Sequence, residues 1–110
     1  MAREPLSLLQ GTADVLILKA LAWKPMHGYG IAVWIRQRTE NDLALEDAAL
    51  YQALHRLERK GWVESEWGVS ENNRRAKFYS IAKSGRQHLR AEVVELRRYF
   101  DALFRVLDTA

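Results

Sequence analysis

The densest group of basic side chains in this sequence lies near residue 75. Arg74, Arg75 and Lys77 fall within four residues of one another, where a polar turn leads into a short β-like segment. Guanidinium and ammonium groups bind phosphate oxygens through charge-assisted hydrogen bonds. These three cations could therefore hold a phosphate backbone. Taken alone, a basic turn of this kind is more often simply solvated, so its meaning depends on what precedes it.

A second polar group lies on one face of the segment before this turn. Between residues 47 and 61, apolar side chains recur at helical spacing and leave the polar and small ones on the opposite face. A helix in the major groove reads base edges with such residues, because glutamine bonds adenine bidentately and alanine leaves room for a thymine methyl group. Of this face, we expect Arg56 and Arg59 to meet phosphates. The whole face consists of Ala48, Ala49, Tyr51, Gln52, His55, Arg56 and Arg59.

The residues that catalysis or metal binding would need do not converge. His27, His55 and His88 fall in a turn, on an exposed helix face and in the last helix, without the paired spacing of a metal site. We expect His27 to bond the backbone of its turn. The sequence has no cysteine, so it forms no disulfide and no thiolate metal site. We expect no enzymatic activity, no metal and no cofactor.

The composition is that of a soluble domain with a local basic surplus. Residues 46–90 carry nine basic and six acidic side chains, and the whole chain has a net charge of +3. That surplus favours a polyanionic partner, although a solvated basic face has the same composition. No run of about 20 apolar residues could span a bilayer, and Glu4 and Pro5 stand where a signal peptide would begin its apolar stretch. We expect a cytoplasmic protein without a membrane partner.

Five elements must position these side chains. We expect helices over residues 12–23, 29–38 and 47–61, a β-hairpin of strands 62–67 and 76–81, and a last helix over residues 83–107. Thr12 can cap the first helix and Pro25 ends it, while Gly61 can take the left-handed conformation that closes the third. The first helix is apolar on nearly every side, so we expect it to be buried all round.

The last helix carries an apolar seam whose members alternate steps of four and three residues, which is heptad spacing. Fewer than three heptads are short for an independent coiled coil, but they form a good dimerisation edge if the first helix packs beside them. The alternative is that the helix folds back on its own core. The predicted dimer interface consists of this seam, which is widened by Phe104: Leu89, Val93, Leu96, Phe100, Leu103, Phe104 and Leu107.

Together, these elements predict a fold that is mainly α with a small β-hairpin, a winged helix-turn-helix with a long C-terminal dimerisation helix. In such a fold the third helix enters the major groove and the hairpin, called the wing, reaches the neighbouring backbone. We expect residues 1–82 to form the DNA-binding domain and residues 83–110 the dimerisation helix. The alternative is a winged module that binds another protein through its apolar last helix, because fold does not determine function.

Several long, ordered motifs resemble the PadR family of bacterial transcriptional regulators. They are PMHGYGI at residues 25–31, ALYQALHRLE at 49–58, GWV at 61–63 and KFYSI at 77–81. The resemblance covers nearly the whole chain, and the length is similar to that of short PadR-like proteins with one C-terminal helix. It implies a homodimer that presents two winged domains to a pseudo-palindromic operator and typically represses transcription.

The sequence also departs from the family pattern. It has Glu46-Asp47-Ala48-Ala49 where the family often has Ser-Pro-Gly-Thr/Ser, and Ala82 where a threonine usually caps the last helix. Asp47 can still cap, but Glu46 repels phosphates, so the base contacts can differ.

Family members that sense small molecules tend to do so in an aromatic cavity at the dimer interface. By that resemblance, Tyr99, Phe100 and Phe104 of the last helix could line such a cavity together with Trp23 and Trp34, since flat aromatic ligands stack between rings. The alternative is that these side chains simply fill the interface.

Overall fold

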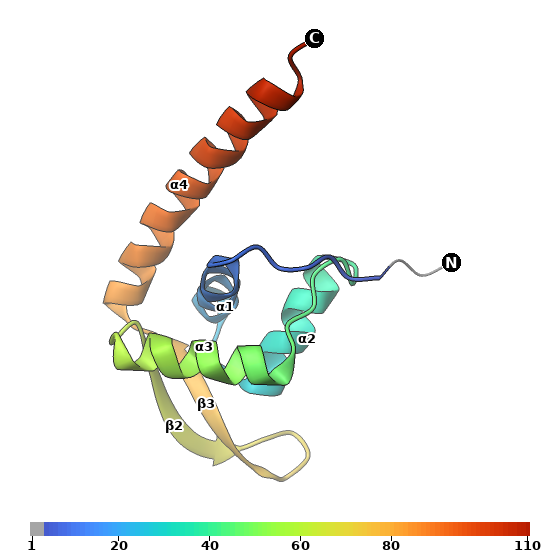
Figure 1. Ribbon diagram of the computed structural model, residues 1–110. Helices are drawn as coiled ribbons and strands as arrows, with labels where there is room; N and C mark the ends of the chain where they lie inside the picture. The colour runs from blue at the N-terminus through green and yellow to red at the C-terminus, as the bar shows by residue number, and fades with distance from the viewer. Residues whose placement is uncertain (1–3) are drawn as a thin grey trace.

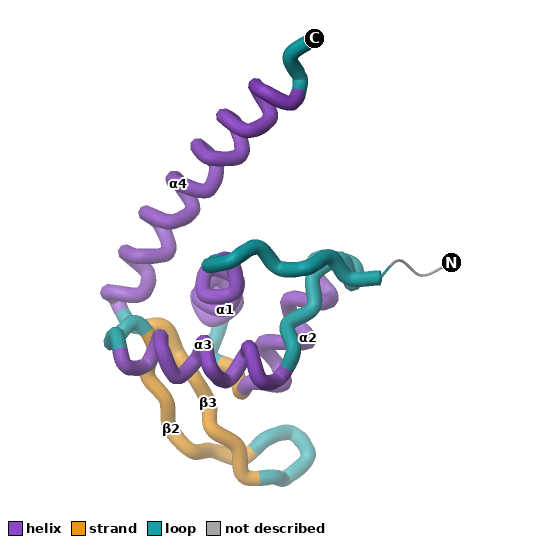
Figure 2. Tube along the Cα trace, viewed as in Figure 1, coloured by secondary structure: helices purple, strands orange, loops and turns teal. Residues whose placement is uncertain are grey.

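The computed structural model describes residues 4–110 and places a small sheet beneath three helices, with a fourth helix that extends away from them (Figure 1). The elements are α1 (Thr12–Trp23), β1 (Met26–His27), α2 (Gly28–Arg38), α3 (Asp47–Arg59), β2 (Val63–Val69), β3 (Arg75–Ile81) and α4 (Lys83–Leu107). Figure 2 shows that the β2–β3 hairpin projects on the side of α3 away from α1. Within residues 4–110, none of the helices combines the length and the apolar character needed to cross a membrane.

Helix α1 forms the centre of the core. Its bounds and its end before Pro25 are as predicted, and Ile17, Leu18 and Leu21 are fully buried or nearly so. The expected all-round burial is wrong, because Lys19 in the middle of the helix is exposed and Trp23 at its C-terminal end is 56% exposed. The expected cap is also wrong, because Gly11 with φ 88° precedes the helix, and the Thr12 hydroxyl donates instead to the Leu9 carbonyl, 2.6 Å away.

A short strand, β1, lies between α1 and α2 and was not predicted. It pairs antiparallel with β3, Met26 opposite Tyr79 and His27 opposite Phe78, so that the sheet has the order β1-β3-β2. A strand of two residues is too short to show an alternating pattern, so only its tertiary partner reveals it. The prediction for His27 is confirmed, since its Nδ1 accepts a hydrogen bond of 3.0 Å from the Gly30 amide and caps α2.

Helix α3 buries the predicted stripe of Leu50, Ala53, Leu54 and Leu57. Gly61 has φ 76°, the left-handed conformation that lets the chain leave the helix, as predicted. The helix begins after Glu46 without a side-chain cap, so the expected capping role of Asp47 is wrong. Because no side chain caps α3, the burial of its apolar stripe is what positions the helix, and the opposite face is left exposed.

The hairpin strands are longer than predicted and leave a turn of residues 70–74. The turn closes through the Ser70 amide, which donates to the Arg74 carbonyl at 2.8 Å, and through Asn73, whose φ is 60°. Asparagine tolerates this left-handed conformation better than most residues. The turn therefore projects as a defined tip beyond the sheet.

The first turns of α4 pack against the rest of the same chain. Gly85 is buried so closely that an added Cβ would overlap the Trp62 carbonyl oxygen, and the Trp62 and His88 rings stack with centroids 3.7 Å apart. Leu89 is only 7% exposed and Val93 packs partly against the core. This corrects the expectation that Leu89 begins the dimer seam, because its side chain is already covered within one chain.

Candidate nucleic-acid interface

The outer face of α3 is open to solvent. All seven residues predicted to contact DNA from this helix are exposed: Ala48, Ala49, Tyr51, Gln52, His55, Arg56 and Arg59. We call this set the reading face. Small side chains lie in its first turn and cations in its last turns, which is the order that base contact followed by phosphate contact requires.

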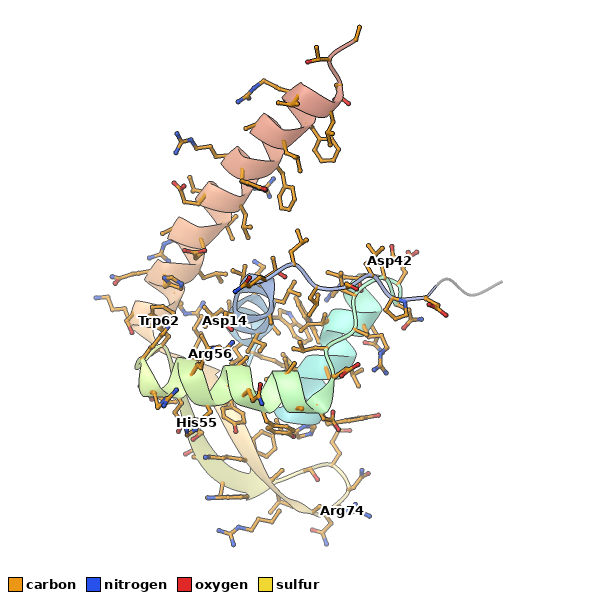
Figure 3. All side chains as sticks on the ribbon, in the orientation of Figure 1. Asp14, Asp42, His55, Arg56, Trp62 and Arg74 are labelled. Atoms are coloured by element: carbon orange, nitrogen blue, oxygen red, sulfur yellow. The ribbon has the colours of Figure 1, made fainter. Side chains whose placement is uncertain are left out.

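Arg56 differs from its neighbours because it already has a partner. Its Nη2 lies 2.7 Å from Oδ1 of Asp14 in the first turn of α1 (Figure 3). An ion pair of this kind partly neutralises the guanidinium and turns it toward α1. Arg56 therefore has to leave Asp14 before it can contact a phosphate as predicted.

The wing separates its charges between two faces. Trp67 lies opposite Lys77 and Val69 opposite Arg75, so alternation puts these four side chains on one face of the hairpin. Glu64 and Glu66 lie on the other face and are exposed. We call the first of these the cationic face of the wing.

The cationic face is turned toward α3. Ser65 belongs to the same face, and its hydroxyl donates to Glu58 of α3. The Arg75 guanidinium lies 4.5 Å from the centroid of the Trp67 ring, while Arg74 is exposed at the tip of the hairpin (Figure 3). The fold thus brings the wing cations to the side of the molecule that carries the reading face.

A surface hollow of about 960 Å³ joins these parts. Its lining includes Tyr29 at the start of α2, Tyr51 of the reading face, and Trp67, Arg75 and Lys77 of the wing. The Tyr51 ring lies so close to the backbone of Gly28 that a Cβ there would overlap it. Glycine is therefore needed at residue 28 for this position of Tyr51.

Two of the hollow's aromatic residues were not predicted. Tyr29 is 74% exposed and Trp67 is 60% exposed, and both can offer a ring and a hydrogen-bond donor to a ligand. Trp67 shares the cationic face because it lies opposite Lys77. The sequence does not give the register of the hairpin, so this position could not be predicted. No signal in the sequence distinguishes Tyr29 from an ordinary surface tyrosine.

Four of the five aromatic residues predicted for an effector cavity form two separate pairs. Trp23 and Trp34 stack with centroids 6.3 Å apart, whereas Tyr99 and Phe100 contact each other edge to face on α4 at 5.6 Å. A hollow of about 570 Å³ beside the tryptophans has no lining residue from α4. One chain therefore does not bring the two pairs into one cavity.

The outer part of the α4 seam is uncovered in a single chain. Leu96 and Phe100 are half-buried, while Leu103, Phe104 and Leu107 are 36%, 54% and 62% exposed. A row of large apolar side chains on an extended helix is typical of a contact surface. Among residues 4–110, no cluster of histidine and acidic side chains has the arrangement of a metal site.

The arrangement of α2 and α3, followed by a hairpin whose cations flank α3, defines a winged helix-turn-helix protein. A family model described as "Transcriptional regulator PadR-like family" matches residues 17–91, well over half of the chain. The chain belongs to this family of transcriptional regulators, which implies DNA-binding regulation. The resemblance and the fold class inferred from the sequence are thereby confirmed.

One relative and two solved structures match most of this chain. An uncharacterized protein of Lysinibacillus sphaericus is 32% identical over 88 residues, which cover 80% of this chain and 81% of that protein. A transcriptional regulator from Clostridium thermocellum is similar with a TM-score of 0.80 and 27% identity, over 87% of this chain and 93% of the other. A PadR family transcription regulator from Clostridium difficile R20291 is similar with a TM-score of 0.77 and 29% identity, over 88% and 99%.

Proposed function

We propose that this chain is a sequence-specific regulator that binds double-stranded DNA as a homodimer on a pseudo-palindromic operator and represses transcription. The observation that carries the proposal is the position of Arg75 and Lys77 on the wing face turned toward α3. Because the reading face and these cations point to one side, a single duplex can meet both. A bacterial regulator of this kind acts in the cytoplasm, where the chromosome lies.

In this proposal α3 enters the major groove and the wing follows the neighbouring backbone. Gln52 and the alanines of the first turn meet base edges, and Arg74, Arg75, Lys77 and Arg59 meet phosphates. Tyr29 and Trp67 are added to the contact residues because they line the hollow between the two parts.

The proposed dimer uses the uncovered length of α4. Residues 1–82 supply the reading domain, and residues 83–110 pair with α4 and α1 of a second copy. Its interface begins at Leu96 and continues through Phe100, Leu103, Phe104 and Leu107, since Leu89 and Val93 already pack within one chain. Two linked reading domains are what half-sites about 34 Å apart require.

A small aromatic effector would release the operator by changing the spacing of the two domains. A cavity that includes both Trp23 with Trp34 and Tyr99 with Phe100 needs a second copy, because one chain holds the pairs apart. Such a ligand would stack between the rings.

The test is duplex selection followed by salt titration. We expect bound fragments selected from random duplexes to share a pseudo-palindrome, and the logarithm of affinity to fall by about 0.9 per log unit of salt for each neutralised phosphate. The Arg74→Ala/Arg75→Ala variant should lower that slope by about 1.8 for each subunit, or about 3.6 for the dimer. As a control with equal loss of charge, Arg98→Ala/Arg105→Ala on α4 should leave it nearly unchanged. If no duplex is enriched even at low salt, the rival function as a protein-binding module is favoured.

A further inference from the structure

Glu58, in the last turns of α3, contacts both strands of the wing. Its Oε2 accepts a hydrogen bond of 2.5 Å from the Ser65 hydroxyl on β2, and its Oε1 lies 3.8 Å from the Lys77 ammonium on β3. Each carboxylate oxygen thus contacts a residue of a different strand. A single side chain of the third helix therefore holds the hairpin at two points.

The strand register explains why the two partners meet at one carboxylate. Ser65 lies opposite Tyr79 and Trp67 opposite Lys77, so Ser65, Lys77 and Tyr79 share the face that is turned toward α3. The Lys77 ammonium lies 6.0 Å from the centroid of the Tyr79 ring. Burial raises the pKa of the Tyr79 phenol, and the negative charge of Glu58 raises it further. The carboxylate, the ammonium and the phenol therefore form one cluster between α3 and the wing.

This contact lies between the base and the tip of the hairpin. The base of the hairpin is tied to the body through the Ala82 amide, which donates to the Trp62 carbonyl at 2.9 Å, whereas the tip at residues 71–75 is exposed. Glu58 holds the strands between these two ends. A small change of tilt there would move Arg74 and Arg75 along the phosphate backbone.

A carboxylate beside the proposed DNA surface opposes binding in general. It repels phosphates and partly neutralises Lys77, so simple electrostatics predicts that its loss strengthens contact with any duplex. Its benefit must therefore lie in geometry. If the wing is fixed relative to the reading face, the protein prefers duplexes in which the bases fit the reading face while the phosphates fit the wing.

We propose that Glu58 is a positioning residue that fixes the wing relative to α3 and thereby raises the preference of the protein for its operator over other duplexes. The proposal rests on the proposed function, since it assigns a source to sequence specificity. It predicts that affinity and specificity change in opposite directions when the carboxylate is neutralised.

The first experiment compares Glu58→Gln with Glu64→Gln. Both remove one negative charge, but Glu64 lies on the opposite face of β2 and is exposed. Glu58→Gln should bind random duplex at least as tightly as the unchanged protein, with a salt slope higher by up to about 0.9 per subunit as Lys77 is released. Its ratio of operator to random affinity should fall about tenfold, comparable to the loss of one base contact.

The control Glu64→Gln should keep the affinity ratio of the unchanged protein within about twofold. The proposal is overturned if Glu58→Gln also keeps the ratio, or if Glu64→Gln loses as much of it. A parallel fall in operator and random affinity would also overturn it, because that pattern is what mere loss of folding produces.

A second measurement separates this proposal from the proposed function. In Glu58→Gln, the pKa of Tyr79 followed by ultraviolet absorbance should fall, and amide exchange in β2 and β3 should quicken, while Glu64→Gln changes neither. These readouts need no DNA. If the unchanged protein binds no duplex, the proposed function fails, and the exchange data still decide whether Glu58 holds the wing. Unchanged exchange in Glu58→Gln would overturn the positioning role itself.

Discussion

The Arg56 guanidinium lies 2.7 Å from the carboxylate of Asp14 and joins the reading face to the first turn of α1 (Figure 3). The two side chains are 44% and 20% exposed, and ion pairs this close to solvent contribute about 0–1 kcal/mol. The pair therefore stabilises the fold little. The main effect of the pair is on the charge of the reading face, because Arg56 is partly neutralised before any phosphate approaches.

We predict that Arg56→Ala weakens duplex binding less than Arg74→Ala does. Arg74 is exposed at the tip of the wing, whereas Arg56 must leave Asp14 to reach a phosphate. Conversely, Asp14→Asn should raise the salt slope by up to about 0.9 per subunit, because it releases Arg56. Fluorescence anisotropy at several salt concentrations measures both effects. A larger loss for Arg56→Ala than for Arg74→Ala would show that the cation leaves Asp14 when DNA binds.

We predict that Gly85→Ala destabilises the protein strongly. The added methyl group would overlap the Trp62 carbonyl oxygen and press on Ile81, and overpacking of this kind costs about 1–3 kcal/mol. Gly30→Ala in α2 is the control, because its Cβ would meet only ordinary contacts of 3.5 Å. There the higher helix propensity of alanine should leave stability equal or about 1 kcal/mol higher. Urea unfolding measures both, and equal stability of the two variants would contradict the close packing at Gly85.

We predict that Phe100→Asp yields monomers and weak operator binding. The substitution places a charge in the middle of the apolar α4 surface, where pairing with a second copy would bury it. Ala91→Asp introduces the same charge on the opposite side of the helix and should leave the dimer intact. Sedimentation velocity distinguishes the outcomes. If Phe100→Asp remains dimeric, the interface lies elsewhere on the molecule.

We predict that stability decreases as pH rises above about 10. The pKa of Tyr79 is raised above its ordinary value of 10.0 by burial and by Glu58 and Tyr51. The unfolded chain therefore loses this phenolic proton at lower pH than the folded protein does, so the stability is fully present below pH 10 and is lost as pH rises toward the folded pKa. Urea unfolding at pH 9 and pH 11 should show a smaller loss for Tyr79→Phe than for Tyr99→Phe. Equal losses would place the raised pKa at another residue.

Helix positions were largely predictable because their signals are local. The bounds of α1 and α4 and the buried stripe of α3 follow from apolar spacing and from Pro25 and Gly61, which act on the chain beside them. The cations of the wing were likewise visible as a cluster at Arg74, Arg75 and Lys77. What could not be predicted was the side to which each of them points, since that depends on the register of a hairpin whose turn is polar throughout.

The sequence by itself determined the helices, the hairpin, the polar face of α3 and the family to which the chain belongs, because each of these follows from the order of residues within a short segment. Only the tertiary structure decided that β1 pairs with β3, that Leu89 lies in the chain's own core, and that Arg56 and Glu58 are held by partners on other elements. The physical reason is that these contacts join elements through packing. Periodicity states which face of a helix is apolar, but not which charged group of a neighbouring element will lie against its polar face.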